Sequence, residues 1–387
     1  MTFRVPALAC AALLALAGCT DNAPTGAGTA ATTRSLSVTA SDTECKVSAG
    51  TAPSGTLTFA VTNTGTLVNE FYLLASDGLR IIAEVENIGP GLTRELVLSA
   101  PTGSYFSSCK PGMVGEGIRA AFEVTDSGQQ VGPTGDDAEL VAAADKAYGS
   151  YVRDQIDQLL VKTKTFAELY SAGSDDEARA LYAPARVHWE RVETVAESFG
   201  DLDPKMDARE ADLEVGQKWT GWHRIEKDLW PARAKGYTQL TTTERATYAK
   251  DLVDNTQVLH DRVTTMTFTA DGIANGAKGL LDEVATGKVT GEEEYWSRTD
   301  LWDFQANVDG ARVAWEGLRD LLKRKNATLD GQIETRFSEL QTLLDQQKSG
   351  DGFVTYDKLT KAQVKELSDA VNALSEPLSK MAGAVLS

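Results

Sequence analysis

Residues 126–137, DSGQQVGPTGDD, divide the 387-residue chain into two parts with different hydrophobic patterns. The segment is small, polar and rich in glycine, which is typical of a linker. Before it, apolar and polar residues alternate; after it, apolar residues recur every three or four positions. All seven tryptophans and all three histidines lie beyond residue 137. The sequence therefore predicts an all-β domain at 34–125 and an all-α domain at 138–387, joined by the linker at 126–137.

The first part has the pattern of short strands separated by turns. Ser35 to Ala40, SLSVTA, alternates strictly, and turn signals follow at 77–78, 89–91 and 101–103. Short alternating segments at this spacing favour a β-sandwich. We expect strands at 35–40, 57–62, 70–74, 79–85, 95–98, 105–108 and 118–124.

The second part has helical periodicity. Two stripes of apolar residues, from Tyr148 to Leu159 and from Val364 to Leu378, each place their members on one face of a helix. Thr241 and Glu244 fit a capping box, and Pro184 fits the first turn of a helix. We expect about seven or eight helices, packed as one or two antiparallel bundles.

The first nineteen residues indicate export and lipidation. Arg4 precedes the uncharged, mostly apolar segment 5–17, which is short for a membrane span and fits a signal peptide at 1–18. The segment ends in LAGC at 16–19, the pattern of a lipobox, so Cys19 would carry the lipid anchor. Residues 19–33 would form a flexible tether. The sequence thus predicts an extracytoplasmic protein that is anchored to the cell membrane and does not span it.

Charge and cysteine content restrict the partners. A net charge of −18 argues against a nucleic-acid partner and attracts cations, although a solvated surface is the ordinary explanation. Cys45 and Cys109 would form a disulfide in an oxidising compartment. The alternative is a second metal site, with these cysteines as thiolates beside Glu70. No histidine lies between residues 20 and 187, which excludes a blue-copper site because that site needs two imidazoles.

Two motifs in the second part carry candidate metal ligands. Residues 186–193, RVHWERVE, place Glu190 and Glu193 three apart, and residues 221–226, GWHRIE, do the same for His223 and Glu226. On helices, side chains three apart share a face, and Asp207 lies between the motifs in sequence. Imidazole and carboxylates from facing helices are how bundles build sites for iron, manganese or zinc. A solvated acidic face and a structural histidine are the competing interpretations.

Several enzyme classes find no support in the sequence. The His-x-x-Glu spacing differs from the His-Glu-x-x-His of zinc proteases, which supplies two imidazoles. Neither a Gly-x-Ser-x-Gly elbow nor a P-loop occurs. His260 fits a surface or core position, and Trp189 and Trp222 fit the core.

The residues described so far resemble the EfeO-type family of periplasmic iron-uptake lipoproteins. The resemblance is carried by the lipobox and by residues 69–72 (NEFY), 84–91 (EVENIGPG), 109–117 (CKPGMVGEG), 186–210, 221–226 and 299–310 (TDLWDFQANVDG). It implies a cupredoxin-like sandwich followed by an imelysin-like helical domain. One departure is visible, because this chain has Trp296-Ser297-Arg298 where relatives often have Tyr-Ser-His.

The resemblance also implies a function and a ligand set. The implied cargo is iron, as Fe²⁺ or Fe³⁺, with copper and zinc as alternatives. The implied partners are an inner-membrane iron permease and a haem peroxidase of the dye-decolorising type. The implied metal ligands are Glu190, Glu193, Asp207, His223 and Glu226, with Glu293 as a weaker candidate.

Three function classes follow for testing. The first is an iron-binding protein that captures the ion in a cleft of the helical domain and passes it to the permease. The second is a surface-anchored metallopeptidase, which needs an open coordination position and a general base. The third is a polymer-binding lipoprotein, which the negative charge disfavours for anionic polymers.

Overall fold

The computed structural model describes residues 33–387, apart from 79, 116 and 214–215. The expected signal peptide at 1–18, the lipid-bearing Cys19 and nearly all of the tether at 19–33 lie outside the described residues. Those predictions therefore stay predictions. The described residues belong to one compact unit.

The N-terminal part is a sandwich, as the alternating pattern predicts, and both of its sheets mix parallel and antiparallel pairs. One sheet has the strand order β2-β1-β4-β7 and the other β3-β9-β8-β5-β6; the pairs β1/β4 and β3/β9 are parallel. The rings of Phe59, Phe71 and Phe122 meet in the core, with centroids 5.2 and 5.5 Å from Phe59. The strands are β1 Ser35–Ala40, β2 Cys45–Val47, β3 Thr51–Pro53, β4 Gly55–Asn63, β5 Asn69–Leu74, β6 Ile81–Ile88, β7 Thr93–Ala100, β8 Gly103–Cys109 and β9 Ile118–Thr125.

A disulfide joins the two sheets of the sandwich. Cys45 in β2 is bonded to Cys109 in β8, with the Cα atoms 5.4 Å apart and the two residues 64 positions apart in sequence. Closing a loop of that length stabilises the fold by about 4 kcal/mol through the entropy of the unfolded chain. The disulfide prediction is confirmed.

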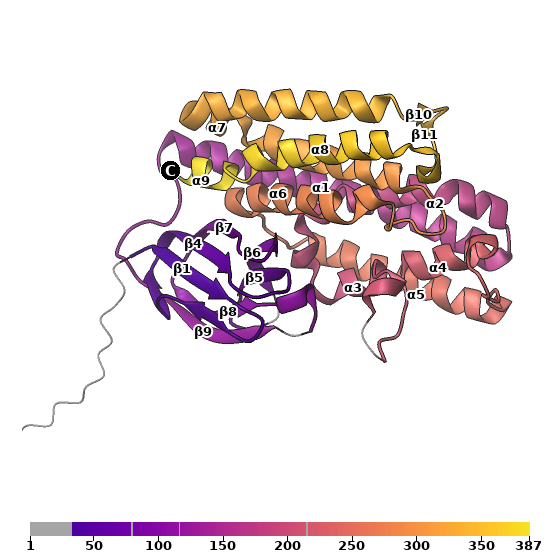
Figure 1. Ribbon diagram of the computed structural model, residues 1–387, viewed down its shortest axis with the longest axis horizontal. Helices are drawn as coiled ribbons and strands as arrows, with labels where there is room; N and C mark the ends of the chain where they lie inside the picture. Colours follow the sequence, from indigo (N-terminus) through magenta and orange to yellow (C-terminus); the bar gives the residue numbers. More distant parts are fainter. Residues whose placement is uncertain (1–32, 79, 116, 214–215) are drawn as a thin grey trace, which may run out of the picture. The chain divides into compact units, whose positions relative to one another are not determined.

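The C-terminal part is helical, and Figure 1 shows α1, α6, α7 and α8 running along one another. Long-range packing is extensive between α1 and α5, between α6 and α7, and between α7 and α8. The helices are α1 Asp136–Ala172, α2 Asp175–Glu190, α3 Asp203–Met206, α4 Trp222–Leu229, α5 Thr242–Val263, α6 Ala270–Thr286, α7 Asp300–Asp345, α8 Lys361–Leu378 and α9 Met381–Leu386. The described elements also include five single 3₁₀ turns and one longer 3₁₀ segment, η2 Glu193–Leu202. The single turns are η1 Pro111–Met113, η3 Glu210–Asp212, η4 Pro231–Arg233, η5 Lys288–Thr290 and η6 Tyr356–Lys358, and the short strands are β10 Lys348–Ser349 and β11 Gly352–Phe353.

Two local predictions for the helices have opposite outcomes. The capping box is confirmed, because the Thr241 hydroxyl accepts from the Glu244 N–H at the start of α5 and the Glu244 carboxylate accepts from the Thr241 N–H. The prediction for Pro184 is wrong, because this proline lies inside α2 rather than in its first turn. Tyr182 and Trp189 are fully buried on either side of it. Tertiary packing therefore holds the helix through a residue that would otherwise interrupt it.

The sandwich and the helices meet at α6. The Ser99 N–H donates to Asp271 Oδ2 at 2.8 Å, and the Asn275 amide donates to the Val97 carbonyl at 2.8 Å. Arg94 of β7 pairs with Asp282 of α6 at 3.1 Å. None of the helices in the described part of the chain is both long enough and apolar enough to cross a membrane.

Candidate metal centre

Gly221 brings the two sequence motifs of the helical part together. Its φ of 85° lies in the region that favours glycine, and a Cβ there would overlap the carbonyl of Met206. The Thr220 hydroxyl also donates to the Lys205 carbonyl at 2.7 Å. The start of α4 therefore packs directly on the end of α3, and His223 comes close to Asp207.

His223 presents its two ring nitrogens to different partners. Nδ1 lies 3.2 Å from Glu226 Oε2. The other oxygen of Glu226 accepts from the backbone N–H groups of Trp296 and Ser297, at 2.8 and 2.6 Å. Glu226 is thus fixed by the backbone and in turn fixes the imidazole ring, the arrangement that orients metal-binding histidines in proteins.

The Nε2 atom of His223 points toward two carboxylates. It lies 3.5 Å from Asp207 Oδ1 and 3.5 Å from Glu293 Oε1, is buried, and has no hydrogen-bond partner among the described residues. Ligand atoms around a tetrahedral ion with bonds of about 2.1 Å are about 3.4 Å apart. These three side chains also form one of the groups whose ligand atoms all lie within 4.8 Å of one another. Asp207, His223 and Glu293 can therefore hold one cation.

The charge state of these groups agrees with a ligand role for the two acids. Burial raises the pKa of Asp207 and of Glu293, but positive neighbours outweigh burial and hold both below their usual ranges. Those neighbours include Arg186 and His223 for Asp207, and Lys288 and His223 for Glu293. Burial and Arg186 would lower the pKa of His223, yet the surrounding carboxylates raise it to about 10. These directions favour a protonated imidazole between two ionised acids in the metal-free protein, and a cation bound at Nε2 would replace this proton.

Glu190 and Glu193 converge, although not in the way the sequence suggests. The expectation that one helix carries both is wrong, because α2 ends at Glu190 and Glu193 begins η2. Their carboxylates meet instead at Lys288 Nζ, which lies 2.6 Å from Glu190 Oε2 and 2.6 Å from Glu193 Oε2. The Asn307 amide donates to the same two oxygens, at 3.0 and 2.8 Å.

Arg186 contacts acidic side chains on both sides of the site, Asp207 beside His223 and Glu190 beside Glu193. Its guanidinium is fully buried and bonds to Asp207, to Glu190 and, at 2.7 Å, to Glu294. Glu293 and Asp303 lie slightly farther away, each 3.7 Å from a guanidinium nitrogen. An arginine suits this position because its five donors reach several carboxylates at once.

Sequence reasoning missed the cations and the outer acids of this centre. It did not single out Arg186, Lys288, Glu294, Asp303 or Asn307, all of which are buried. A signal was present in one case, since Asp303 and Asn307 share a face of α7 with apolar neighbours. For Lys288 no such pattern exists, because it lies in a single turn between Gly287 and Gly291.

The remaining residues that the sequence singled out play other parts. His188 hydrogen-bonds Gln155, and burial lowers its pKa to about 4. His260 is partly exposed beside Asp157 and Asp261, in agreement with a surface position. Trp222 packs in the core against Phe166 and Tyr182, and Trp189 both packs there and donates to Asp207 Oδ2 at 2.8 Å.

The candidate second metal site in the sandwich has lost two of its donors. In the disulfide, Cys45 and Cys109 offer no thiolate. Glu70 is buried and accepts a hydrogen bond from Tyr72. A metal held by both sulfurs and Glu70 would need the reduced protein, so this site stays a prediction.

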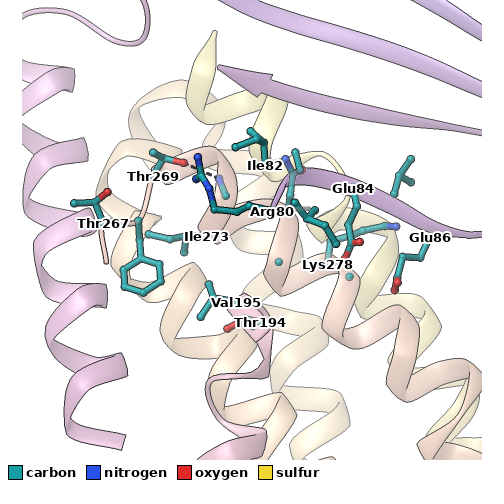
Figure 2. Close-up of a pocket in the computed structure, with 18 residues that line it drawn as sticks. Arg80, Ile82, Glu84, Glu86, Thr194, Val195, Thr267, Thr269, Ile273 and Lys278 are labelled. Atoms are coloured by element: carbon teal, nitrogen blue, oxygen red, sulfur yellow. Dashed lines mark hydrogen bonds between the residues drawn. The ribbon is translucent and has the colours of Figure 1, made fainter. Parts of the chain in front are cut away.

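A cavity of about 230 Å³ lies where β6 meets α6 and η2. Figure 2 shows Glu84 and Glu86 of β6 on one wall, with Lys278 of α6 close by. Thr194 and Val195 line it as well, directly after Glu193 in sequence. None of the six candidate ligands lines the cavity. Those ligands are at most 9% exposed, so they form an enclosed centre rather than the wall of an open cleft.

Comparison with known proteins places this arrangement in a family. The family profile described as Imelysin matches residues 144–381, which hold all six candidate ligands. The iron uptake system component EfeO of Yersinia pestis is 35% identical over 357 residues, covering 92% of each chain. That of Escherichia coli K12 is 35% identical over 356 residues, covering 90% of each chain. The chain belongs to the imelysin family and is an EfeO-type protein.

Proposed function

We propose that this chain is the extracytoplasmic iron-binding component of an iron-uptake system. Its helical part would hold one iron ion between Asp207, His223 and Glu293. The observation that carries the proposal is the buried Nε2 of His223, which lacks a hydrogen bond within the described structure and lies 3.5 Å from each of two carboxylates. One nitrogen and two oxygen donors suit iron, manganese or zinc.

The other expected ligands act around this group in the proposal. Glu226 holds the ring through Nδ1 and keeps Nε2 directed at the ion. Trp189 and Arg186 hold Asp207 from its other side. Glu190 and Glu193 meet the ammonium of Lys288 beside this group, so their charge is balanced within the cluster.

The cellular setting follows from the family and the N-terminal sequence. We propose that Cys19 anchors the protein by lipid on the outer face of the cell membrane. From there it would deliver iron to an inner-membrane permease, acting with a dye-decolorising haem peroxidase. The support for this setting is that both relatives described above are named as iron uptake system components.

The deciding experiment compares iron binding by two histidine variants. Fe²⁺ is titrated into the purified protein without oxygen by calorimetry. His223→Ala should abolish measurable binding, whereas His188→Ala should bind as the wild type does, because His188 faces Gln155. Circular dichroism checks that both variants fold. Binding that survives in His223→Ala with unchanged affinity would refute the proposal.

The metallopeptidase alternative makes a different prediction. A peptidase must bring a peptide bond to the metal and must hold an activated water there. The enclosed position of the ligands disfavours peptide access. Cleavage of a peptide library by the metal-loaded protein, abolished by a chelator and by His223→Ala, would favour the peptidase instead.

A further inference from the structure

The metal centre has two halves, the group Asp207, His223 and Glu293 and the pair Glu190 and Glu193. We infer that the buried ammonium of Lys288 occupies the Glu190–Glu193 pair and thereby limits the centre to one metal ion. The inference rests on the proposed function, because it concerns the same site. It assigns a selectivity role to a residue that is not itself a metal ligand.

The position of Lys288 is that of a bound cation. Its Nζ lies 2.6 Å from an oxygen of each glutamate, and its side chain is fully buried. A metal ion that coordinated these oxygens at about 2.1 Å would come into contact with the ammonium. Both are positive, so the metal and Lys288 cannot occupy this pair together.

The two halves of the centre differ in how they are blocked. Both oxygens of Glu190 are engaged, one by Arg186 and the other by Lys288. In the other half, Arg186 and Trp189 engage the two oxygens of Asp207. Nε2 of His223, however, has no hydrogen-bond partner in the described part of the chain, and Glu293 lies 3.4 Å from its neighbour Arg209. A metal can therefore approach His223 while the Glu190–Glu193 pair stays closed.

Lys288 and Arg186 have different roles despite their equal charge. Arg186 bonds acids from several segments of the fold, including Asp207 and Glu294, so it is a structural part of the cluster. Lys288 is bonded within 3 Å only to the two glutamates, among the described residues. Removing its ammonium would leave this pair without its nearest counter-charge.

Asn307 would complete a second site once the ammonium is gone. Its side chain contacts both glutamates, and its Oδ1 is buried without a hydrogen-bond partner in the described structure. An amide can reverse its ends and present the oxygen instead of the nitrogen. Glu190, Glu193 and Asn307 would then offer three oxygen donors to a hard divalent cation such as Mn²⁺.

The experiment counts the metal ions bound to the protein. Mn²⁺ is titrated into the purified protein by calorimetry, and bound metal is measured after gel filtration. Wild type should bind one ion per chain and Lys288→Met should bind two. Lys278→Met is the matched control, because Lys278 is a largely buried lysine that is likewise paired with an acid, Asp282 of α6. This variant should bind one ion. In the two-ion variant, the electron paramagnetic resonance spectrum should show coupling between neighbouring Mn²⁺ ions.

Other results would overturn the inference, and they differ from the result that would overturn the proposed function. Two ions in wild type, or one ion of unchanged affinity in Lys288→Met, would overturn the inference alone. A variant that binds no metal while wild type binds one would mean that Lys288 supports the ligands rather than competing with the ion. Wild type that binds neither Mn²⁺ nor Fe²⁺ would remove the proposed function itself. If Lys288→Met does not fold, the same count of bound Mn²⁺ is made on Lys288→Gln, which should bind two ions where wild type binds one.

Discussion

Single atoms decide what the centre can bind. The ring of His223 separates two carboxylates on its Nε2 side from Glu226 on its Nδ1 side. The Nε2 side is the one that faces unpaired ligand atoms, since Glu226 on the Nδ1 side is already fixed by two backbone N–H groups. Glu226 therefore determines which nitrogen meets the metal, although it lies next to the site rather than in front of it.

Replacing Glu226 with glutamine should weaken metal binding strongly. The glutamine oxygen can still accept from the backbone, but its amide then donates to Nδ1. This favours the neutral tautomer with its proton on Nε2, the nitrogen that should bind the ion. We expect about 10- to 100-fold weaker binding of Fe²⁺ by calorimetry, which is typical for loss of an orienting partner. Glu316→Gln, at an exposed position of α7, is the control, and equal affinities of the two variants would contradict the assignment.

The candidate metal ligands of the site could be predicted from the sequence, whereas its buried cations could not. His223, Asp207 and Glu293 could be proposed because metal-ligand residue types stand out and because the family resemblance points to them. Arg186 and Lys288 could not, because a lysine or arginine in a sequence is ordinarily exposed. Their burial depends on five or more acids that come from distant segments, and only the folded chain brings these together.

Two glycines let the segment that carries Glu193 pass between helices. A Cβ at Gly276 of α6 would overlap the Thr194 carbonyl, and a Cβ at Gly310 of α7 would overlap the Arg191 carbonyl. The backbone from 191 to 194 therefore packs on bare helix backbone. This close packing accompanies the end of α2 at Glu190, which periodicity alone did not reveal.

Two glycine substitutions on α7 should have opposite effects. Gly310→Ala forces the backbone at Arg191 outward and should cost about 1–3 kcal/mol, as overpacking does. Gly317 has open space around its Cα, so Gly317→Ala should stabilise α7 by up to about 1 kcal/mol. Thermal unfolding measures both changes. A stability of Gly310→Ala equal to that of Gly317→Ala would refute the close packing.

At the scale of the whole chain, the sequence predicts the division into a sandwich and a helical bundle, but it does not predict how the two pack against each other. Period-two and helical patterns on either side of residues 126–137 predict the two architectures, and both are confirmed. The contact through α6 depends on single polar pairs such as Ser99 with Asp271, which no periodicity marks. Asp271 of α6 also forms an acidic pair with Asp145 of α1, whose pKa its charge raises.

This acidic pair should make stability depend on pH. Burial, together with the charge of Asp271, raises the pKa of Asp145 from 3.8 to about 7. Its Oδ1 is buried and lacks a hydrogen-bond partner within the described part of the chain. The folded protein therefore keeps a proton that the unfolded chain releases above pH 3.8. The stability linked to this proton is complete at low pH and is lost as pH rises toward 7.

Asparagine at position 145 cannot ionise, so Asp145→Asn should remove this loss. We expect the melting temperature of the variant, relative to wild type, to be higher at pH 8 than at pH 5, by about 2 °C or more. Asp320→Asn, at an exposed position of α7, controls for the replacement of one aspartate. The sign of the change is the test, since a smaller gain at pH 8 than at pH 5 would contradict a raised pKa of Asp145. A variant whose melting temperature differs from wild type equally at both values of pH would mean that Asp145 is already ionised in the folded protein at pH 5.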